Sequence, residues 1–185
     1  MPIRRIAFVL AWAAINSFAI AWWEHSFEWR LLGTLPEAIM GWLVLYLVAG
    51  VAWPWIPAYV GGRYAFNMAF SFTYNMFPDL QGISWFSTAL TTLIAIPATG
   101  VLCWYTPRGV LWLIMPAAGR SIALAIAELF GQDHFLMMTG ELPVGLMLVS
   151  FGVGLLEGAL LLYILEAQIT ARENAPRAAP ALPSE

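Results

Sequence analysis

The chain has 185 residues, of which 61% are hydrophobic and only 10% are charged. Soluble domains carry roughly 25% charged residues, so this composition excludes an ordinary soluble domain. The eight basic residues are all Arg, and no basic cluster suggests nucleic acid as a partner. The single cysteine, Cys103, excludes an intrachain disulfide and a cysteine-based metal or iron–sulfur site.

Six apolar segments follow one another, at residues 5–23, 37–60, 63–80, 84–105, 109–131 and 143–166. A membrane-spanning helix needs about 20 apolar residues. The third segment is the weakest, because it carries two Asn, a Ser and a Thr. We predict an all-α fold, a transmembrane bundle of six helices with short loops over residues 1–166. Residues 167–185, rich in Ala and Pro, are expected to form a disordered cytoplasmic tail.

The arginines favour this count of six, because basic residues concentrate in cytoplasmic loops. With both termini inside, Arg30 alone falls in an outer loop, together with acidic residues such as Glu37. We therefore predict an inner (plasma) membrane protein of a bacterium with both termini cytoplasmic. The inner residues are Arg4, Arg5, Arg63, Arg108, Arg172 and Arg177.

The first segment has a second interpretation. Arg4 and Arg5 precede an apolar run that ends in Ala19-Ile20-Ala21, a pattern typical of a cleaved signal peptide. Every later segment is also apolar, which favours a retained helix anchored at Trp22 and Trp23.

Arg120 and Glu157 each lie near the middle of an apolar segment. A charge at the bilayer centre costs roughly 2.5–3.5 kcal/mol on insertion scales, so it needs a partner, water or burial among helices. The two residues are at nearly the same predicted depth on consecutive antiparallel helices, which usually neighbour each other. We expect a direct or water-bridged contact, serving either as a structural ion pair or as a substrate or proton site.

Further polar residues occur at membrane depth. Asn67, Ser71 and Asn75 share one face of the third segment, while Asn16 lies in the first and Thr91 in the fourth. Such residues hydrogen-bond between helices or line a wet cavity. The candidate substrate-binding residues are Arg120, Glu157, Asn67, Asn75, Asn16 and Thr91.

Two segments carry small residues at four-residue spacing, which allows close helix packing. The first repeat is Ala13, Ser17 and Ala21, and the second is Ser150, Gly154 and Gly158. Either repeat could pack within the chain, against a membrane protein partner or against a second copy. Apart from the lipid bilayer, these are the partners that the sequence suggests.

Two resemblances are present. Six spans, cytoplasmic termini and a small-residue repeat in the first span resemble the substrate-binding components of energy-coupling-factor vitamin transporters. Phe70-Ser71-Phe72-Thr73-Tyr74, with Trp85-Phe86 and Glu157-Gly158, is similar to the amide and urea channel family. That family has outward-facing termini, opposite to the arginine distribution here. Both resemblances imply a small-solute binding or transport function.

We expect a small-solute transport or substrate-binding membrane protein with a mid-membrane polar cavity around Arg120 and Glu157. In it Arg120 would bind an anionic or carbonyl group, Glu157 would balance it, and the Asn residues would orient the solute. One alternative is a non-catalytic accessory subunit of a membrane complex. Another is an intramembrane enzyme acting on lipid through Glu157 or Asp79. No catalytic motif is present, and the sequence suggests neither a cofactor nor a metal.

Overall fold

The computed structural model describes residues 2–25, 30–77, 84–130, 138–139 and 142–174. Helices make up almost all of this part of the chain, so the expected all-helical fold is confirmed. A two-residue antiparallel pairing of Met138–Thr139 (β1) with Leu142–Pro143 (β2) is the exception. The helices are α1 (Pro2–His25), α2 (Arg30–Ala49), α3 (Trp55–Met76), α4 (Ser84–Cys103), the 3-10 helix η3 (Pro107–Ile114), α5 (Met115–Phe130), α7 (Val144–Ile164) and α8 (Glu166–Asn174).

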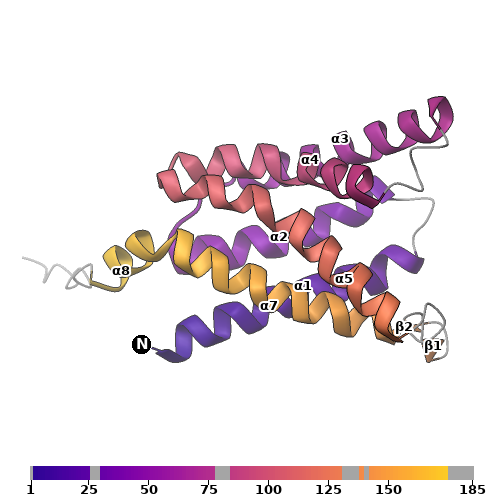
Figure 1. Ribbon diagram of the computed structural model, residues 1–185. Coiled ribbons are helices and arrows are strands. Elements are labelled where there is room, and N and C mark those ends of the chain that lie inside the picture. The colour runs from indigo at the N-terminus through magenta and orange to yellow at the C-terminus, as the bar shows by residue number, and fades with distance from the viewer. Residues whose placement is uncertain (1, 26–29, 78–83, 131–137, 140–141, 175–185) are drawn as a thin grey trace, which may run out of the picture.

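The long helices run antiparallel to one another in chain order (Figure 1). Each helix contacts the next along the chain, from α1 through α2, α3 and α4 to η3 and α5. α5 contacts α7, and α7 packs along α1, so the first and last long helices are neighbours. The helices therefore form a closed ring, with the start of α1 and the short helix α8 at the same end (Figure 1).

The turn between α2 and α3 falls inside the predicted second segment, so the predicted bounds of the second and third segments are wrong. α2 begins at Arg30 and ends at Ala49, where Gly50 takes a φ of 75° and its N–H donates to the Tyr46 carbonyl at 3.0 Å. This is the left-handed glycine cap that commonly ends a helix. Hydropathy did not reveal the turn because its residues, among them Val51 and Trp53, are themselves apolar.

The changed helix bounds alter the position of two charged residues. Glu37 and Arg63 were predicted in loops on opposite sides of the membrane, yet both lie inside helices, eight residues into α2 and nine into α3. The two residues face each other in the interior, as described below.

The two small-residue repeats pack against each other. A Cβ added to Gly154 of α7 would lie 2.7 Å from the Ala13 Cα of α1, and one added to Gly158 would lie 3.1 Å from the Val9 Cα. The Ser17 hydroxyl also donates to the Met147 carbonyl at 3.0 Å. The described members of both repeats are therefore used within the chain. The same packing joins α1 to α7 along much of its length, and whether the first helix is retained or cleaved stays a prediction.

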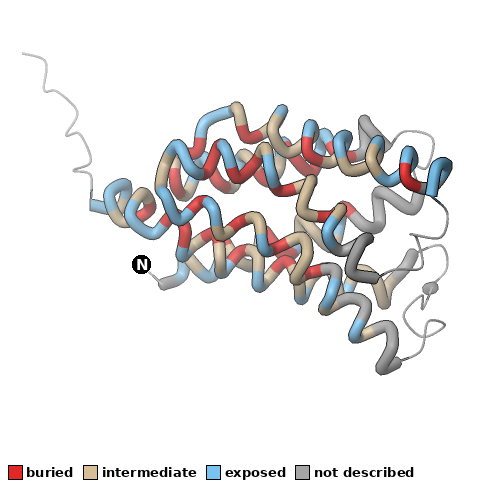
Figure 2. The backbone as a smooth tube through the Cα atoms, turned by 45° about the horizontal axis from the view of Figure 1, so that its top comes forward, coloured by how far each residue is buried: buried red, intermediate tan, exposed pale blue. Residues whose placement is uncertain are grey.

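The interior of the bundle holds an apolar core together with a few polar side chains, and large apolar side chains are also exposed on the outside. Buried positions face the middle of the bundle along the described helices (Figure 2). Polar side chains are buried, including Thr34, Glu37, Thr91 and Thr99. Exposed large apolar side chains occur on α1, α2, α3, α4, η3 and α7, for example Ile3, Ile6, Leu10, Leu43, Leu47, Met68, Phe72, Ile96, Ile114, Leu148, Leu156 and Tyr163.

The end of the chain also differs from expectation. The disordered tail was predicted from residue 167, but α8 continues the helical chain to Asn174. α8 is held by Ile169, which is 2% exposed, and by Arg172, whose guanidinium donates to the Tyr46 and Leu47 carbonyls at the end of α2. A cation near the end of a helix interacts favourably with its last carbonyls and with the helix dipole. Residues 175–185 lie outside the described residues.

Within the described residues, α7 (Val144–Ile164) is the one helix whose length and composition suffice to cross a membrane. Two shorter apolar stretches occur at Thr34–Ala49 and Ala89–Cys103. The helical architecture is thus confirmed, whereas the six membrane spans remain a prediction.

The α1–α7 contact generates a test with a matched control. Gly154→Ala should destabilise the protein by about 1–3 kcal/mol, because the new methyl group would overlap the α1 backbone. Gly152→Ala adds the same methyl group where nothing lies within 4 Å, and should leave stability unchanged or slightly raised. Thermal unfolding of the detergent-purified variants measures both, and equal shifts would contradict the packing described.

Candidate functional site

A cavity of about 290 Å³ lies inside the ring of helices. Its polar lining comes from α1, α3, α4 and α7, and apolar residues of η3, α5 and α7 complete the wall. The polar residues that line it are Asn16, Tyr59, Arg63, Thr91, Ser150 and Glu157. The volume is near the lower end of the roughly 300–1,000 Å³ typical of ligand pockets.

One side of the cavity rests on a buried cluster of Glu37, Tyr59 and Arg63. The Arg63 Nη2 lies 3.2 and 3.5 Å from the two carboxylate oxygens of Glu37, and the Tyr59 hydroxyl donates to the same carboxylate. The Glu37 side chain is 4% exposed and that of Arg63 is 26% exposed. Removing such a charge from water is costly, so each of the two stabilises the other's ionised form.

Tyr59 and Arg63 are one helical turn apart, which places both on the face of α3 that meets α2. The guanidinium lies 5.8 Å from the centre of the Tyr59 ring and 3.5 Å from its hydroxyl oxygen. Arg63 and Tyr59 thus belong both to the ion-pair cluster and to the cavity wall.

A second carboxylate enters the cavity from α7. The indole Nε1 of Trp12 donates to the Glu157 carboxylate at 3.1 Å. Asn16, one turn along α1, donates to the Trp12 carbonyl at 3.1 Å and also lines the cavity. The close approach of α1 and α7 at Gly154 and Gly158 brings these groups together.

Three tryptophans from three helices meet beside the cavity. Trp12, Trp55 and Trp112 pack edge to face, with each pair of ring centres 6.1 Å apart. Trp55 precedes Tyr59 on α3, and Trp112 precedes the cavity residue Pro116. The tryptophans therefore close the cavity toward the end that holds α8 and the start of α1.

The structure brings together three of the six candidate residues from the sequence. Asn16, Thr91 and Glu157 all line the cavity. The Arg120 side chain lies outside the described residues, so its expected contact with Glu157 stays a prediction. Its neighbour Gly119 lines the cavity and faces Val153 of α7.

Asn67 and Asn75 are not among the cavity residues, and Asn75 is exposed. For Asn75 the reason is the pitch of the helix. Residues spaced by four rotate by about 40° per step. A face that starts at Arg63 in the cavity has therefore turned by about 120° at Asn75.

Sequence reasoning missed Glu37, Tyr59, Arg63 and Trp12. Glu37 and Arg63 were assigned to loops because an apolar window was carried across the turn. Gly50, Pro54 and Pro57 are the signal that could have placed that turn, since Gly and Pro mark breaks between helices. Moving the break there places both charges inside helices.

Within the described ranges, His, Cys, Asp and Glu side chains form no group of three or more that could hold a metal ion. The site therefore offers hydrogen-bonding and charged groups around a small cavity. No family model, curated protein or solved structure matches the chain, so neither resemblance noted in the sequence has further support.

The buried pair predicts a strongly non-additive mutant cycle. Arg63→Met should cost about 3–5 kcal/mol, because it leaves the Glu37 carboxylate buried without its cation. Glu37→Gln should also destabilise, and the double variant should recover much of the loss, since two neutral groups remain. Thermal or denaturant unfolding in detergent measures the cycle.

Arg108 and Glu166 provide the control. Their side chains are 50% and 52% exposed and lie 3.9 Å apart, so the same cycle should give at most about 1 kcal/mol. Additive behaviour at Glu37 and Arg63 would show that the two charges do not depend on each other.

Proposed function

We propose that the chain is an integral membrane protein in which six helical spans enclose a binding site for a small polar solute. The spans would be α1, α2, α3, α4, η3 with α5, and α7. The supporting observation is that many large apolar side chains are exposed on the outside of the bundle, while the charged side chains of Glu37, Arg63 and Glu157 lie inside it. Lipid tails are suited to such a surface, whereas water is not.

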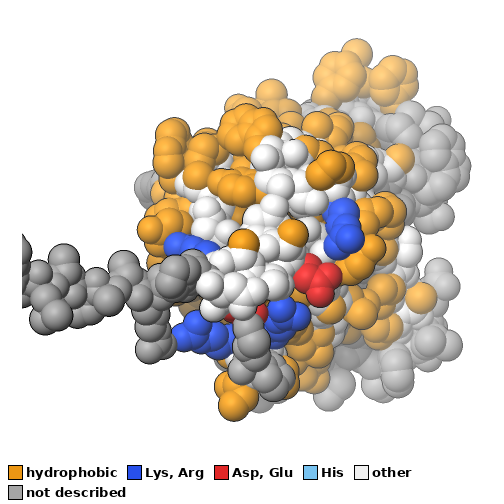
Figure 3. All heavy atoms as spheres, turned by 90° about the vertical axis from the view of Figure 1, so that its left-hand side faces the viewer, with side chains coloured by type: hydrophobic (Ala, Val, Ile, Leu, Met, Phe, Trp, Pro, Cys, Tyr) orange, Lys and Arg blue, Asp and Glu red, His pale blue; other side chains and the backbone are white. Residues whose placement is uncertain are grey.

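The distribution of charge supports an orientation. Viewed from the end that holds α8, basic side chains gather among apolar ones (Figure 3). Arg4 and Arg5 begin α1, Arg108 begins η3, and Arg172 lies in α8, all at this end. Basic residues favour the cytoplasmic side, so both described ends of the chain would face the cytoplasm.

The charged and polar groups of the cavity indicate which class of solute it would bind. Arg63 is already matched by Glu37. Glu157 is the other charged side chain of the described lining, and the Trp12 indole donates a hydrogen bond to its carboxylate. A carboxylate beside Asn16, Thr91 and Ser150 favours a solute that carries amine or amide N–H groups. The tryptophans close the cavity toward the cytoplasmic end, so the solute would enter from the opposite side.

The two alternatives from the sequence have less support. The accessory-subunit hypothesis relied on the small-residue repeats, and Ala13, Ser17, Gly154 and Gly158 of these repeats already make contacts between α1 and α7. For lipid chemistry, Asp79 lies outside the described residues, and the Glu157 carboxylate accepts a hydrogen bond from Trp12. Neither alternative accounts for the polar cavity inside the ring of helices.

The only native cysteine provides a test of membrane topology. Cys103 is exposed at the end of α4 that lies beside the basic residues. In intact bacteria a membrane-impermeant maleimide should not label it, while a permeant maleimide should. The matched probe is Asn75→Cys in a Cys103→Ser background, exposed near the opposite end, which should react with both reagents. Impermeant labelling of Cys103 in intact cells would exclude the proposed orientation.

Solute binding is tested with purified protein and a panel of small amines, amides and carboxylates, using thermal stabilisation as the readout. We expect stabilisation by members of the amine or amide classes. Glu157→Gln should weaken that binding by about tenfold or more, the cost of losing a charge-assisted hydrogen bond, while keeping an acceptor for Trp12.

Glu166→Gln is the control, because it removes the same charge from an exposed position on α8. It should leave the affinity unchanged. Stabilisation by carboxylates alone, or equal losses in the two variants, would contradict a solute site at Glu157.

A further inference from the structure

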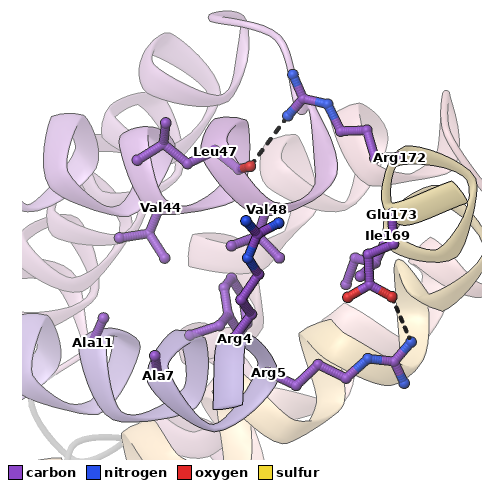
Figure 4. Close-up of a pocket in the computed structure, with 11 residues that line it drawn as sticks. Arg4, Arg5, Ala7, Ala11, Val44, Leu47, Val48, Ile169, Arg172 and Glu173 are labelled. Carbon is purple, nitrogen blue, oxygen red and sulfur yellow. Dashed lines mark hydrogen bonds and ion pairs between the residues drawn. The ribbon is translucent and has the colours of Figure 1, made fainter. Parts of the chain in front are cut away.

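A second, larger cavity of about 510 Å³ lies at the basic end, between α1, α2 and α8. It does not share a lining residue with the polar cavity. Arg4 and Arg5 contribute from α1, and Arg172 and Glu173 from α8 (Figure 4). The rest of its lining is apolar and consists of Ala7, Phe8, Ala11, Val44, Leu47, Val48 and Ile169.

The three arginines of this cavity differ in the groups that they contact. Arg5 pairs with Glu173 at 3.5 Å, and Arg172 donates to the carbonyls that end α2. Arg4 has neither a hydrogen bond nor an ion pair among the described residues. Its side chain extends from α1 and lines the cavity (Figure 4). The lining thus carries three positive charges and one negative charge, and the Arg4 guanidinium is the positive charge that an anionic ligand could contact.

The apolar part of the cavity continues onto the outer surface of the bundle. Leu47 is 66% exposed, and Leu43, one turn earlier on α2, is 46% exposed. Ala7 is exposed on the facing side of α1. A ligand that occupied the cavity would therefore have a basic group at one end and an apolar channel leading outward along α1 and α2.

We propose that this cavity binds an anionic phospholipid, with its phosphate at Arg4 and an acyl chain between α1 and α2. The inference rests on the membrane placement proposed above, which puts the cavity at the level of the cytoplasmic headgroups. Anionic lipids are concentrated in that leaflet, and basic pockets between helices on that side bind their headgroups. The α1–α2 channel would bury apolar surface that a soluble anion could not cover.

Matched charge variants test the headgroup contact. The affinity of the detergent-purified full chain for phosphatidylglycerol is measured by native mass spectrometry, with phosphatidylcholine as the uncharged comparison. Arg4→Gln should weaken phosphatidylglycerol binding about fivefold, the effect of one basic residue near a headgroup. Arg108→Gln removes a charge at the same end but outside the cavity, and should leave the affinity unchanged.

Matched size variants test the acyl channel. Ala11 lines the cavity, whereas Ala14 is exposed on α1 and does not line it. Ala11→Phe should reduce phosphatidylglycerol binding, because the ring fills the channel, and Ala14→Phe should not. Thermal unfolding of each variant shows that the comparison is between folded proteins.

Three outcomes would overturn the proposal. Equal losses in Arg4→Gln and Arg108→Gln would indicate a general surface charge effect. Displacement of the lipid by glycerol 3-phosphate, at the concentration where phosphatidylglycerol itself competes, would indicate a soluble anion site. Lipid binding that appears only after removal of residues 175–185 would show that the chain's own end is the occupant. Maleimide labelling tests the membrane placement by itself. The membrane placement and the lipid site can therefore be contradicted independently.

Discussion

The buried pair of Glu37 and Arg63 is the constraint on which the rest of the structure depends. Either charge alone inside an apolar bundle would be strongly destabilising, so α2 and α3 must pack in the register that joins them. The turn at Gly50 makes this register possible, because its positive φ ends α2 and lets α3 return alongside. The Tyr59 hydroxyl then adds a further hydrogen bond to the same carboxylate.

The same constraint shapes the polar cavity. Once Arg63 is held by Glu37, its face of α3 is directed inward, and Tyr59 and Arg63 become cavity wall. The opposite wall depends on a different interaction, the backbone contact of α1 with α7 at Gly154, which brings Trp12 to Glu157. Two carboxylates, one guanidinium and three tryptophans thus come from five separate elements, and each is fixed by a contact with another. Such mutual support is what a preorganised binding site requires.

The polar cavity differs in chemistry from the cavity between α1, α2 and α8, here called the basic cavity. The polar cavity lies within the ring of helices, and Trp12, Trp55 and Trp112 pack together between it and the α8 end. The basic cavity is bounded by α8, which Ile169 and Arg172 hold against the end of α2. In the proposed membrane placement, the first would serve a solute and the second a lipid headgroup. α8 is a nine-residue helix whose position depends on these contacts rather than on its own stability.

The sequence by itself determined the helical class, the close packing implied by the small-residue repeats, and Asn16, Thr91 and Glu157 as inward polar residues. These follow from local composition and four-residue spacing. Glu37 and Arg63 were misplaced because hydropathy cannot distinguish an apolar turn from an apolar helix, and Asn75 because a four-residue stripe rotates around its helix. Only the tertiary structure decided which buried charge meets which, since that pairing depends on the register between helices far apart in the chain.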